Sequence, residues 1–139
     1  EGIWLKRAHR GAMDAVQRGT VVKGQGLEGS VGRSRRRQVT LIEREVWERL
    51  MDEIGADASP AGRRANLMLS GISLANTRGR TLRIGSVRIA IGGETTPCER
   101  MDEVGPGLRT LMIPDWGDGA FGQVLHGGIV NVGDVVEWE

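Results

Sequence analysis

The sequence is poor in aromatic residues and in cysteine, and it carries no large excess of either charge. It has no tyrosine, one phenylalanine and four tryptophans, which argues against a nucleic-acid surface built from exposed stacking rings. Nineteen basic residues against eighteen acidic ones give a net charge of +1, which excludes polyanion binding through overall charge. The single cysteine cannot form an internal disulfide, as expected for a reducing compartment, here the cytoplasm.

Long hydrophobic runs are also absent. No apolar stretch approaches the roughly 18 residues that a membrane span requires, and no signal-peptide pattern opens the chain. Apolar residues make up 39% of the chain and charged residues 27%, which is typical of a globular protein, and 139 residues fit one domain over 1–139. The 22 glycines are spread along the chain, which indicates many tight turns between short strands.

The clearest local pattern is a hairpin over residues 80–91. Gly85-Ser86 is a two-residue turn of the kind that tight hairpins prefer. This turn places four apolar residues on one buried face in two facing pairs, Ile84 with Val87 and Leu82 with Ile89. The same register sets Arg83 opposite Arg88, which is unfavourable unless solvent or an anion lies between them.

Further strands and two helices complete the predicted fold. We predict strands over residues 3–7, 20–23, 38–42, 66–69, 122–125, 129–132 and 135–138. A helix is predicted near 43–54, with a glycine stop at Gly55 and an apolar stripe of Val46, Trp47, Leu50 and Ile54. A shorter helix is predicted over 106–113. The pattern favours a mainly β fold, a compact β-barrel with one amphipathic helix and short helical turns.

Cys98 is the only thiol, and it follows the hairpin in a segment rich in turn residues. A thiolate is a strong nucleophile and a soft metal ligand, and nearby positive charge favours its formation. Arg100 could supply that charge, whereas Glu94 and Glu99 would oppose it. The alternative is that Cys98 is a small buried hydrophobic residue.

Two arginine-rich segments stand immediately before predicted strands. One is the run 33–37, Arg-Ser-Arg-Arg-Arg, and the other is Arg63-Arg64. The first run is consistent with a solvated loop, a nucleic-acid contact or an anion clamp. Guanidinium groups suit phosphate and oxyanions, so both segments and the thiol could surround an anionic ligand.

Other chemistries have weaker support. His9 and His126 are not at ligand spacing from Cys98, so we do not expect a zinc site. The sequence has no Gly-x-Ser-x-Gly elbow and no Walker-type phosphate loop. Gly24-x-Gly26-x-x-Gly29 matches a dinucleotide fingerprint in spacing, but arginines follow it instead of an apolar helix, so we interpret the match as chance.

Five short motifs follow one another along the chain, and none is decisive alone. They are Arg37-Gln38-Val39-Thr40-Leu41-Ile42, Arg64-Ala65-Asn66-Leu67 with Ser70-Gly71-Ile72, Leu82-x-Ile84-Gly85, Pro97-Cys98-x-Arg100, and Gly127-Gly128 leading to Val132-Gly133-Asp134. In this order and spacing they resemble the MOSC domain family, the molybdenum cofactor sulfurase C-terminal domains. The resemblance runs from about residue 11 to residue 138. It implies a compact β-barrel and an association with the molybdenum cofactor (molybdopterin).

The resemblance also implies roles for particular residues. In relatives that hold the cofactor, the cysteine matching Cys98 ligates molybdenum, and in others it is proposed to carry sulfur as a persulfide. The arginine matching Arg64 lies at the pterin-phosphate site, and the residue matching Thr96 lines the same pocket. By position in the motifs we add further cofactor-binding candidates: Arg37, Gln38, Asn66 and Arg100. The alternative for Gln38 and Asn66 is structural, namely that they satisfy backbone groups at strand ends.

The chain departs from the family pattern at residues 29–32. Many members carry Gly-Asp followed by a basic residue and often a histidine, where this chain has Gly29-Ser30-Val31-Gly32. This puts one wall of the pocket in doubt. The sequence also shows no pyridoxal-phosphate-dependent desulfurase domain, so a sulfur donor would be a separate protein, a desulfurase or a molybdoenzyme partner.

Two classes of function therefore stay open. The first is a MOSC-domain protein that binds the molybdenum cofactor or carries sulfur on Cys98, with the balance leaning towards an enzyme. The second is a non-catalytic anion-binding or protein-interaction module, for which the four tryptophans would form an exposed surface. We expect an anionic small-molecule ligand, and neither nucleic acid nor a membrane as a partner.

Overall fold

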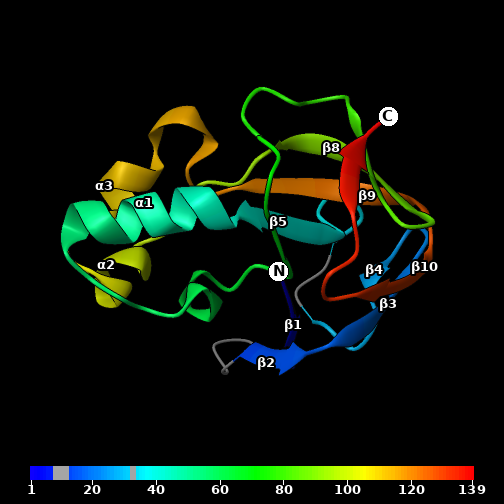
Figure 1. The fold of residues 1–139 in the computed structure, drawn as a ribbon, viewed down its shortest axis with the longest axis horizontal. Coiled ribbons are helices and arrows are strands. Elements are labelled where there is room, and N and C mark those ends of the chain that lie inside the picture. The colour runs from blue at the N-terminus through cyan, green and yellow to red at the C-terminus, as the bar shows by residue number, and fades with distance from the viewer. Residues whose placement is uncertain (8–12, 32–33) are drawn as a thin grey trace.

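The computed structural model describes residues 1–7, 13–31 and 34–139 and places the helices at one end of the molecule and the strands at the other (Figure 1). The strands are β1 (Gly2–Lys6), β2 (Met13–Val16), β3 (Arg18–Val22), β4 (Gly26–Leu27), β5 (Val39–Glu43), β6 (Leu67–Leu69), β7 (Thr81–Ile84), β8 (Val87–Glu94), β9 (Ala120–His126), β10 (Gly128–Asn131) and β11 (Val136–Trp138). The helices are α1 (Arg44–Ile54), α2 (Met101–Val104) and α3 (Leu108–Met112), and the 3₁₀ turns are η1 (Pro60–Arg63) and η2 (Pro114–Trp116).

The strands form two sheets that share one core. The larger sheet has eight strands in the order β11-β7-β8-β9-β5-β6-β1-β2, and the smaller has three in the order β10-β3-β4. In the larger sheet the neighbouring strands β5 and β6 are parallel, and the connection between them contains α1. Apolar side chains of both sheets pack into a single cluster, and Val21, Leu27 and Val130 are the fully buried members from the smaller sheet.

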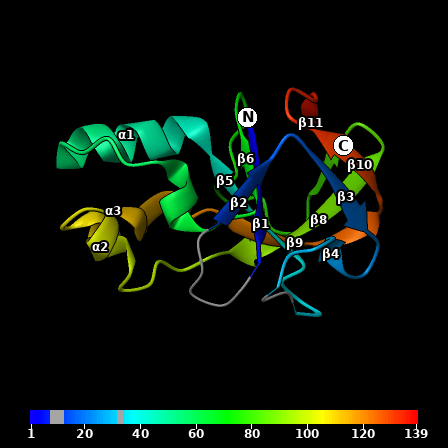
Figure 2. The same ribbon diagram turned by 90° about the horizontal axis from the view of Figure 1, so that it is seen from below.

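The prediction of a mainly β fold is confirmed, but the prediction of a closed barrel is not. Within the described residues no pairing joins β11 to β2, so the larger sheet stays open. The chain instead leaves this sheet at two corners, at Gln17 between β2 and β3 and at Gly127 between β9 and β10. The turn at Gly127 requires glycine, because a Cβ there would lie 2.5 Å from the carbonyl oxygen of Val21. The three-stranded sheet therefore covers the core without continuing the ladder (Figure 2).

The predicted hairpin is confirmed with its register. Ile84 pairs with Val87 and Leu82 with Ile89, and all four side chains are buried. Arg83 stands opposite Arg88, and carboxylates of β11 and of the residue after it supply the anions that this pair needs. Glu137 accepts a hydrogen bond from Arg83 at 2.6 Å, and Glu139 accepts one from Arg88 at 2.8 Å.

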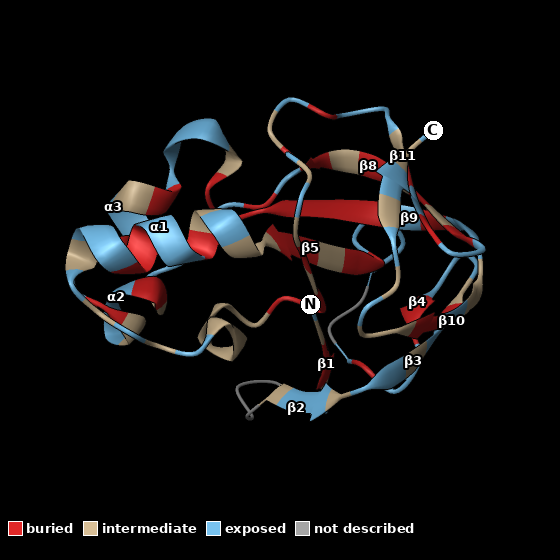
Figure 3. Cartoon of the chain, viewed as in Figure 1, coloured by how far each residue is buried: buried red, intermediate tan, exposed pale blue. Residues whose placement is uncertain are grey.

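The predicted first helix is also confirmed. It runs from Arg44 to Ile54 and ends at Gly55, whose φ of 67° is left-handed. Its buried stripe, red along α1 in Figure 3, packs against α2 and α3 in a second apolar cluster: Trp47, Leu50 and Met51 with Met101, Leu108 and Met112. The second predicted helix is shorter than expected, because Gly107 (φ 86°) precedes its start and Pro114 follows its end.

Three elements were not predicted. Strand β2 has no buried residue, β4 has two residues, and α2 has one turn, so none carries a periodic apolar pattern. The remaining predicted strands are all present, with ends shifted by one or two residues.

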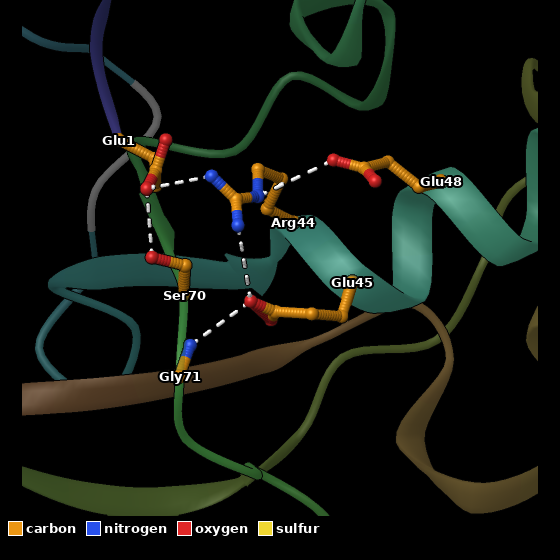
Figure 4. A network of polar contacts seen from close by, with 6 residues as sticks. All are labelled: Glu1, Arg44, Glu45, Glu48, Ser70 and Gly71. Atoms are coloured by element: carbon orange, nitrogen blue, oxygen red, sulfur yellow. Dashed lines mark hydrogen bonds and ion pairs between the residues drawn. The ribbon is translucent and has the colours of Figure 1, made fainter.

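A polar network at the start of α1 holds the β5–α1–β6 crossover to the chain start (Figure 4). Arg44 forms an ion pair with Glu1 at 2.9 Å, and Glu1 also accepts a hydrogen bond from the Ser70 hydroxyl at 2.7 Å. Glu45 accepts a hydrogen bond from the backbone N–H of Gly71 at 2.9 Å. These side chains are partly exposed, so the network orients the segments more than it stabilises the fold.

A buried ion pair joins the helical end to the sheets. The Arg63 Nε lies 2.6 Å from the Asp118 carboxylate and 2.7 Å from the Asp118 carbonyl oxygen, and Arg63 Nη2 donates to the Thr95 hydroxyl at 2.8 Å. The side chains of Arg63 and Asp118 are 10% and 4% exposed. Burial raises the pKa of Asp118, and the Arg63 guanidinium opposes that change. Three distant segments, η1, the end of β8 and the start of β9, are thus fixed to one another.

We predict that Asp118→Asn lowers the free energy of unfolding by about 3 kcal/mol, because it leaves the buried Arg63 charge uncompensated. Urea denaturation at neutral pH measures the change. Asp115→Asn is the matched control, since Asp115 is exposed and asparagine tolerates its left-handed φ of 54°. A loss no larger than that of the control would contradict the structural role of the pair.

Candidate functional site

Arg64 follows the ion-paired Arg63 in the chain and lines a basic cavity. It caps η1 with a left-handed φ of 64°, so adjacent arginines have different environments. The cavity has a volume of about 140 Å³ and lies where the ends of β1, β5 and β6 meet. We call it the first basic cavity, and its lining residues are Lys6, Val31, Arg37, Gln38, Thr40, Arg64 and Asn66.

The charge of the first basic cavity is of one sign. Lys6, Arg37 and Arg64 line it, and no carboxylate is among its described lining residues. Burial lowers the pKa of Lys6, and the charges of Arg64 and Arg100 lower it further. Burial and the charge of Arg100 also lower the pKa of Arg64. These cations repel one another, so a bound anion would relieve their repulsion.

Asn66 shapes the wall of this cavity through bonds within the protein. Its Oδ1 accepts from the Thr40 N–H at 3.1 Å, and its Nδ2 donates to the Ser30 hydroxyl at 3.2 Å and to the Trp4 carbonyl at 3.3 Å. Hydrogen bonds within the protein therefore engage both the oxygen and the nitrogen of the Asn66 amide, as expected if its role is structural. Ser30 stands where many family members have an acid, and its buried hydroxyl also accepts from the Lys6 N–H at 3.0 Å.

Gln38 is held in the same way. Its Oε1 accepts from the Val124 N–H at 2.8 Å, and its Nε2 donates to the Arg35 carbonyl oxygen at 3.0 Å. Both ends of its amide are engaged, which agrees with the structural interpretation. Gln38 thus fixes the arginine-rich segment against β9.

The arginine-rich segment is packed on the only phenylalanine. The guanidinium carbons of Arg37 and Arg36 lie 4.8 and 5.3 Å from the centre of the Phe121 ring. Phe121 is buried, and Gly92 admits it, because a Cβ there would lie 2.6 Å from the ring. Residues 34–37 are all exposed, as expected of a solvated loop, although Arg36 and Arg37 also pack on Phe121, and Arg33 lies outside the described residues. Contact with a ring orients the Arg37 charge at the cavity.

Cys98 is exposed, so the buried-hydrophobe alternative is wrong. It lies between β8 and α2, and its carbonyl oxygen accepts from the Met101 N–H at 3.1 Å. Burial lowers the pKa of Arg63, and the charges of Asp118 and Cys98 oppose that change, which places Cys98 within electrostatic reach of the guanidinium. Thr96 is exposed on the same loop, and its buried neighbour Thr95 anchors the loop to Arg63.

The structure brings some of the predicted site residues together and leaves others apart. Arg37, Gln38, Arg64 and Asn66 line the first basic cavity. Arg100 joins Arg64 in an adjacent hollow of about 370 Å³. Cys98 and Thr96 lie outside both of these linings.

Sequence reasoning missed three residues that build the site: Lys6, Thr95 and Asp118. Each lies at a strand end or turn, where no local pattern marks a contact with a distant segment. For Asp118 the only available signal was its acidic character between two glycines, Gly117 and Gly119.

The histidines and tryptophans contribute little to the site. His126 Nδ1 lies 2.9 Å from the Ser86 carbonyl oxygen, as expected of a turn-flanking residue, and His9 lies outside the described residues. Across residues 1–7, 13–31 and 34–139, no group of three His, Cys, Asp or Glu side chains is placed to hold a metal ion. Trp4 and Trp47 are buried, so the four tryptophans do not form an exposed surface.

No helix in the described part of the chain combines the length and apolar character needed to cross a bilayer.

Several solved structures share this fold, including the following three. The YuaD protein from Bacillus subtilis superposes with a TM-score of 0.83 and 19% identity over 98% of this chain and 92% of that one. YiiM from Geobacillus stearothermophilus superposes with a TM-score of 0.77 and 15% sequence identity, over 99% of this chain and 73% of that one. YiiM from Escherichia coli superposes with a TM-score of 0.74 and 19% sequence identity, over 99% of this chain and 68% of that one. At such identities the likeness shows the fold alone.

Comparison with curated proteins gives no match. The model of the MOSC domain, in contrast, matches residues 28–137, which is most of the chain and includes Cys98, Arg64 and the arginine-rich segment. The order of motifs, the mainly β fold and this match agree. The chain therefore belongs to the MOSC domain family.

Proposed function

We propose that this domain binds the molybdenum cofactor, with its phosphate in the first basic cavity and Cys98 as the ligand of molybdenum. The observation that carries the proposal is a cavity lined by Lys6, Arg37 and Arg64, with no carboxylate among the lining residues that the structure describes. Guanidinium groups bind phosphate through paired hydrogen bonds, and the volume of about 140 Å³ suits a small anionic group.

The residues present fit the two ends of such a cofactor. Thiolate sulfur is a soft ligand that binds transition metals, and Cys98 is exposed. Arg64, which lines the cationic cavity, directly follows Arg63, which is hydrogen-bonded to Thr95 on the loop of Cys98. When bound, the cofactor would supply redox chemistry at the metal that protein side chains do not provide.

The chain's own residues would bind and orient. Arg64 and Arg37 would hold the phosphate, and Lys6 would add charge to the same cavity. The ion pair with Asp118 would keep the Arg63 guanidinium in place beside the loop that carries Cys98. Thr95 would hold the loop that carries Cys98 and Thr96 at a fixed position relative to Arg63.

We predict that Arg64→Ala weakens phosphate binding by about 1–3 kcal/mol, because one charge-assisted hydrogen-bond donor is lost. Titration of inorganic phosphate, followed by amide chemical shifts, measures the change. Arg109→Ala is the matched control, since Arg109 is exposed on α3 and lines neither hollow next to Arg64. Equal affinity of the two variants would argue against Arg64 as a phosphate ligand.

We predict that Cys98→Ser lowers the molybdenum content of protein reconstituted with cofactor at least tenfold, because a hydroxyl replaces the soft ligand. Elemental analysis gives molybdenum per chain, and a urea midpoint equal to that of the parent protein shows that the variant is folded. Unchanged molybdenum content would exclude Cys98 as the ligand.

A second candidate function is favoured by the position of Cys98. The thiol is exposed and lies outside the linings of the first basic cavity and its neighbour, so another protein could reach it. The Cys98 thiolate would attack the terminal sulfur of a donor persulfide. The donor S–S bond would break, the donor cysteine would leave as a thiolate, and Cys98 would keep the sulfur as a persulfide.

This second function predicts a mass increase of one sulfur atom after incubation with a cysteine desulfurase and cysteine. Intact-mass spectrometry measures it, and reduction of the sample should remove the added sulfur. Cys98→Ser should gain no mass, since the chain has no other thiol. An equal gain in the variant, or none in the parent protein, would contradict sulfur transfer to Cys98.

A further inference from the structure

A second basic cavity lies on the other side of the arginine-rich segment. It has a volume of about 500 Å³ and lies where the end of β3 meets β9. Its lining residues are Lys23, Gly24, Arg35, Gln38, Gln123, Val124 and Leu125. Like the first basic cavity, it has cations and amide groups and no carboxylate among its described lining residues.

The backbone around the second basic cavity is fixed. The Arg35 carbonyl oxygen accepts hydrogen bonds from Gln38 Nε2 at 3.0 Å and from Gln123 Nε2 at 3.2 Å. The Gly24 N–H donates to the Val124 carbonyl oxygen at 3.2 Å, which ties the turn after Lys23 to β9. The segments that carry the two cations are therefore held to the same strand, and a ligand would not have to order them.

The two basic cavities meet at Gln38, which lines both. Arg37 lines the first and Arg35 the second, and two residues of extended chain span at most about 7 Å. We infer that the second basic cavity binds a phosphate group, and that both cavities together take one small molecule with two phosphate groups. This inference rests on the proposed function, because it needs phosphate in the first cavity.

A small molecule fits this surface better than a nucleic-acid strand. No aromatic residue lines either cavity within the described chain, and Phe121 is buried beneath Arg36 and Arg37. Single strands are held by stacking of bases on exposed rings as well as by charge. The net charge of +1 also gives no long-range attraction for a polyanion.

The test uses ¹⁵N-labelled protein titrated with inorganic phosphate and with tripolyphosphate. We expect phosphate to shift two separate groups of amides, one around Thr40 and Asn66 and one around Lys23, Gly24 and Gln123. Tripolyphosphate should shift both groups with one common dissociation constant, at least tenfold lower than that of phosphate. Shifts confined to the first group would overturn this inference and leave the proposed function standing. Shifts confined to the second group, or none, would overturn both.

The double variant Lys23→Gln, Arg35→Gln separates the cavities. It should raise the dissociation constant for tripolyphosphate at least tenfold and leave phosphate shifts around Thr40 intact. Arg109→Gln is the control for loss of an exposed charge. Its dissociation constants for phosphate and for tripolyphosphate should stay within twofold of those of the parent protein. A 20-nucleotide single-stranded DNA that binds tenfold tighter than tripolyphosphate would overturn the assignment to a small molecule.

Discussion

The architecture of the site depends on the buried ion pair between Arg63 and Asp118. It joins η1, the end of β8 and the start of β9, which are far apart in the sequence, and Thr95 completes the junction. Burial disfavours both charges, as the raised pKa of Asp118 and the lowered pKa of Arg63 indicate. Such a pair contributes less to stability than to geometry, but losing one partner is costly. Arg64 directly follows Arg63 in the chain, and the Cys98 loop is tied to the pair through Thr95.

The basic cavities are lined by residues at and near strand ends, where arginine and lysine side chains lie beside hydrogen-bonded amides. Asn66 and Gln38 engage their amides with the backbone and with Ser30, so hydrogen bonds within the protein hold the cavity walls. Arg37 is oriented by its contact with Phe121, the only phenylalanine of the chain. The site therefore concentrates positive charge locally although the whole chain is nearly neutral.

The sequence predicted those elements whose formation depends on residues close together in the chain. The hairpin with its register and α1 with its buried stripe were predictable, because alternation, turn chemistry and a 3.6-residue period all lie within a few residues. The open larger sheet was not predictable, because the corners at Gln17 and Gly127 depend on packing against distant strands. At the site, the arginines and Cys98 could be named from sequence. The separate roles of Arg63 and Arg64, and the contributions of Lys6 and Asp118, required the tertiary arrangement.

The most direct measurement is a crystal structure of the domain loaded with the molybdenum cofactor, with anomalous diffraction collected at the molybdenum absorption edge. The proposal predicts an anomalous peak bonded to the Cys98 sulfur and a phosphate within hydrogen-bond distance of Arg64 and Arg37. A molybdenum peak away from Cys98, with the first basic cavity empty of phosphate, would contradict it.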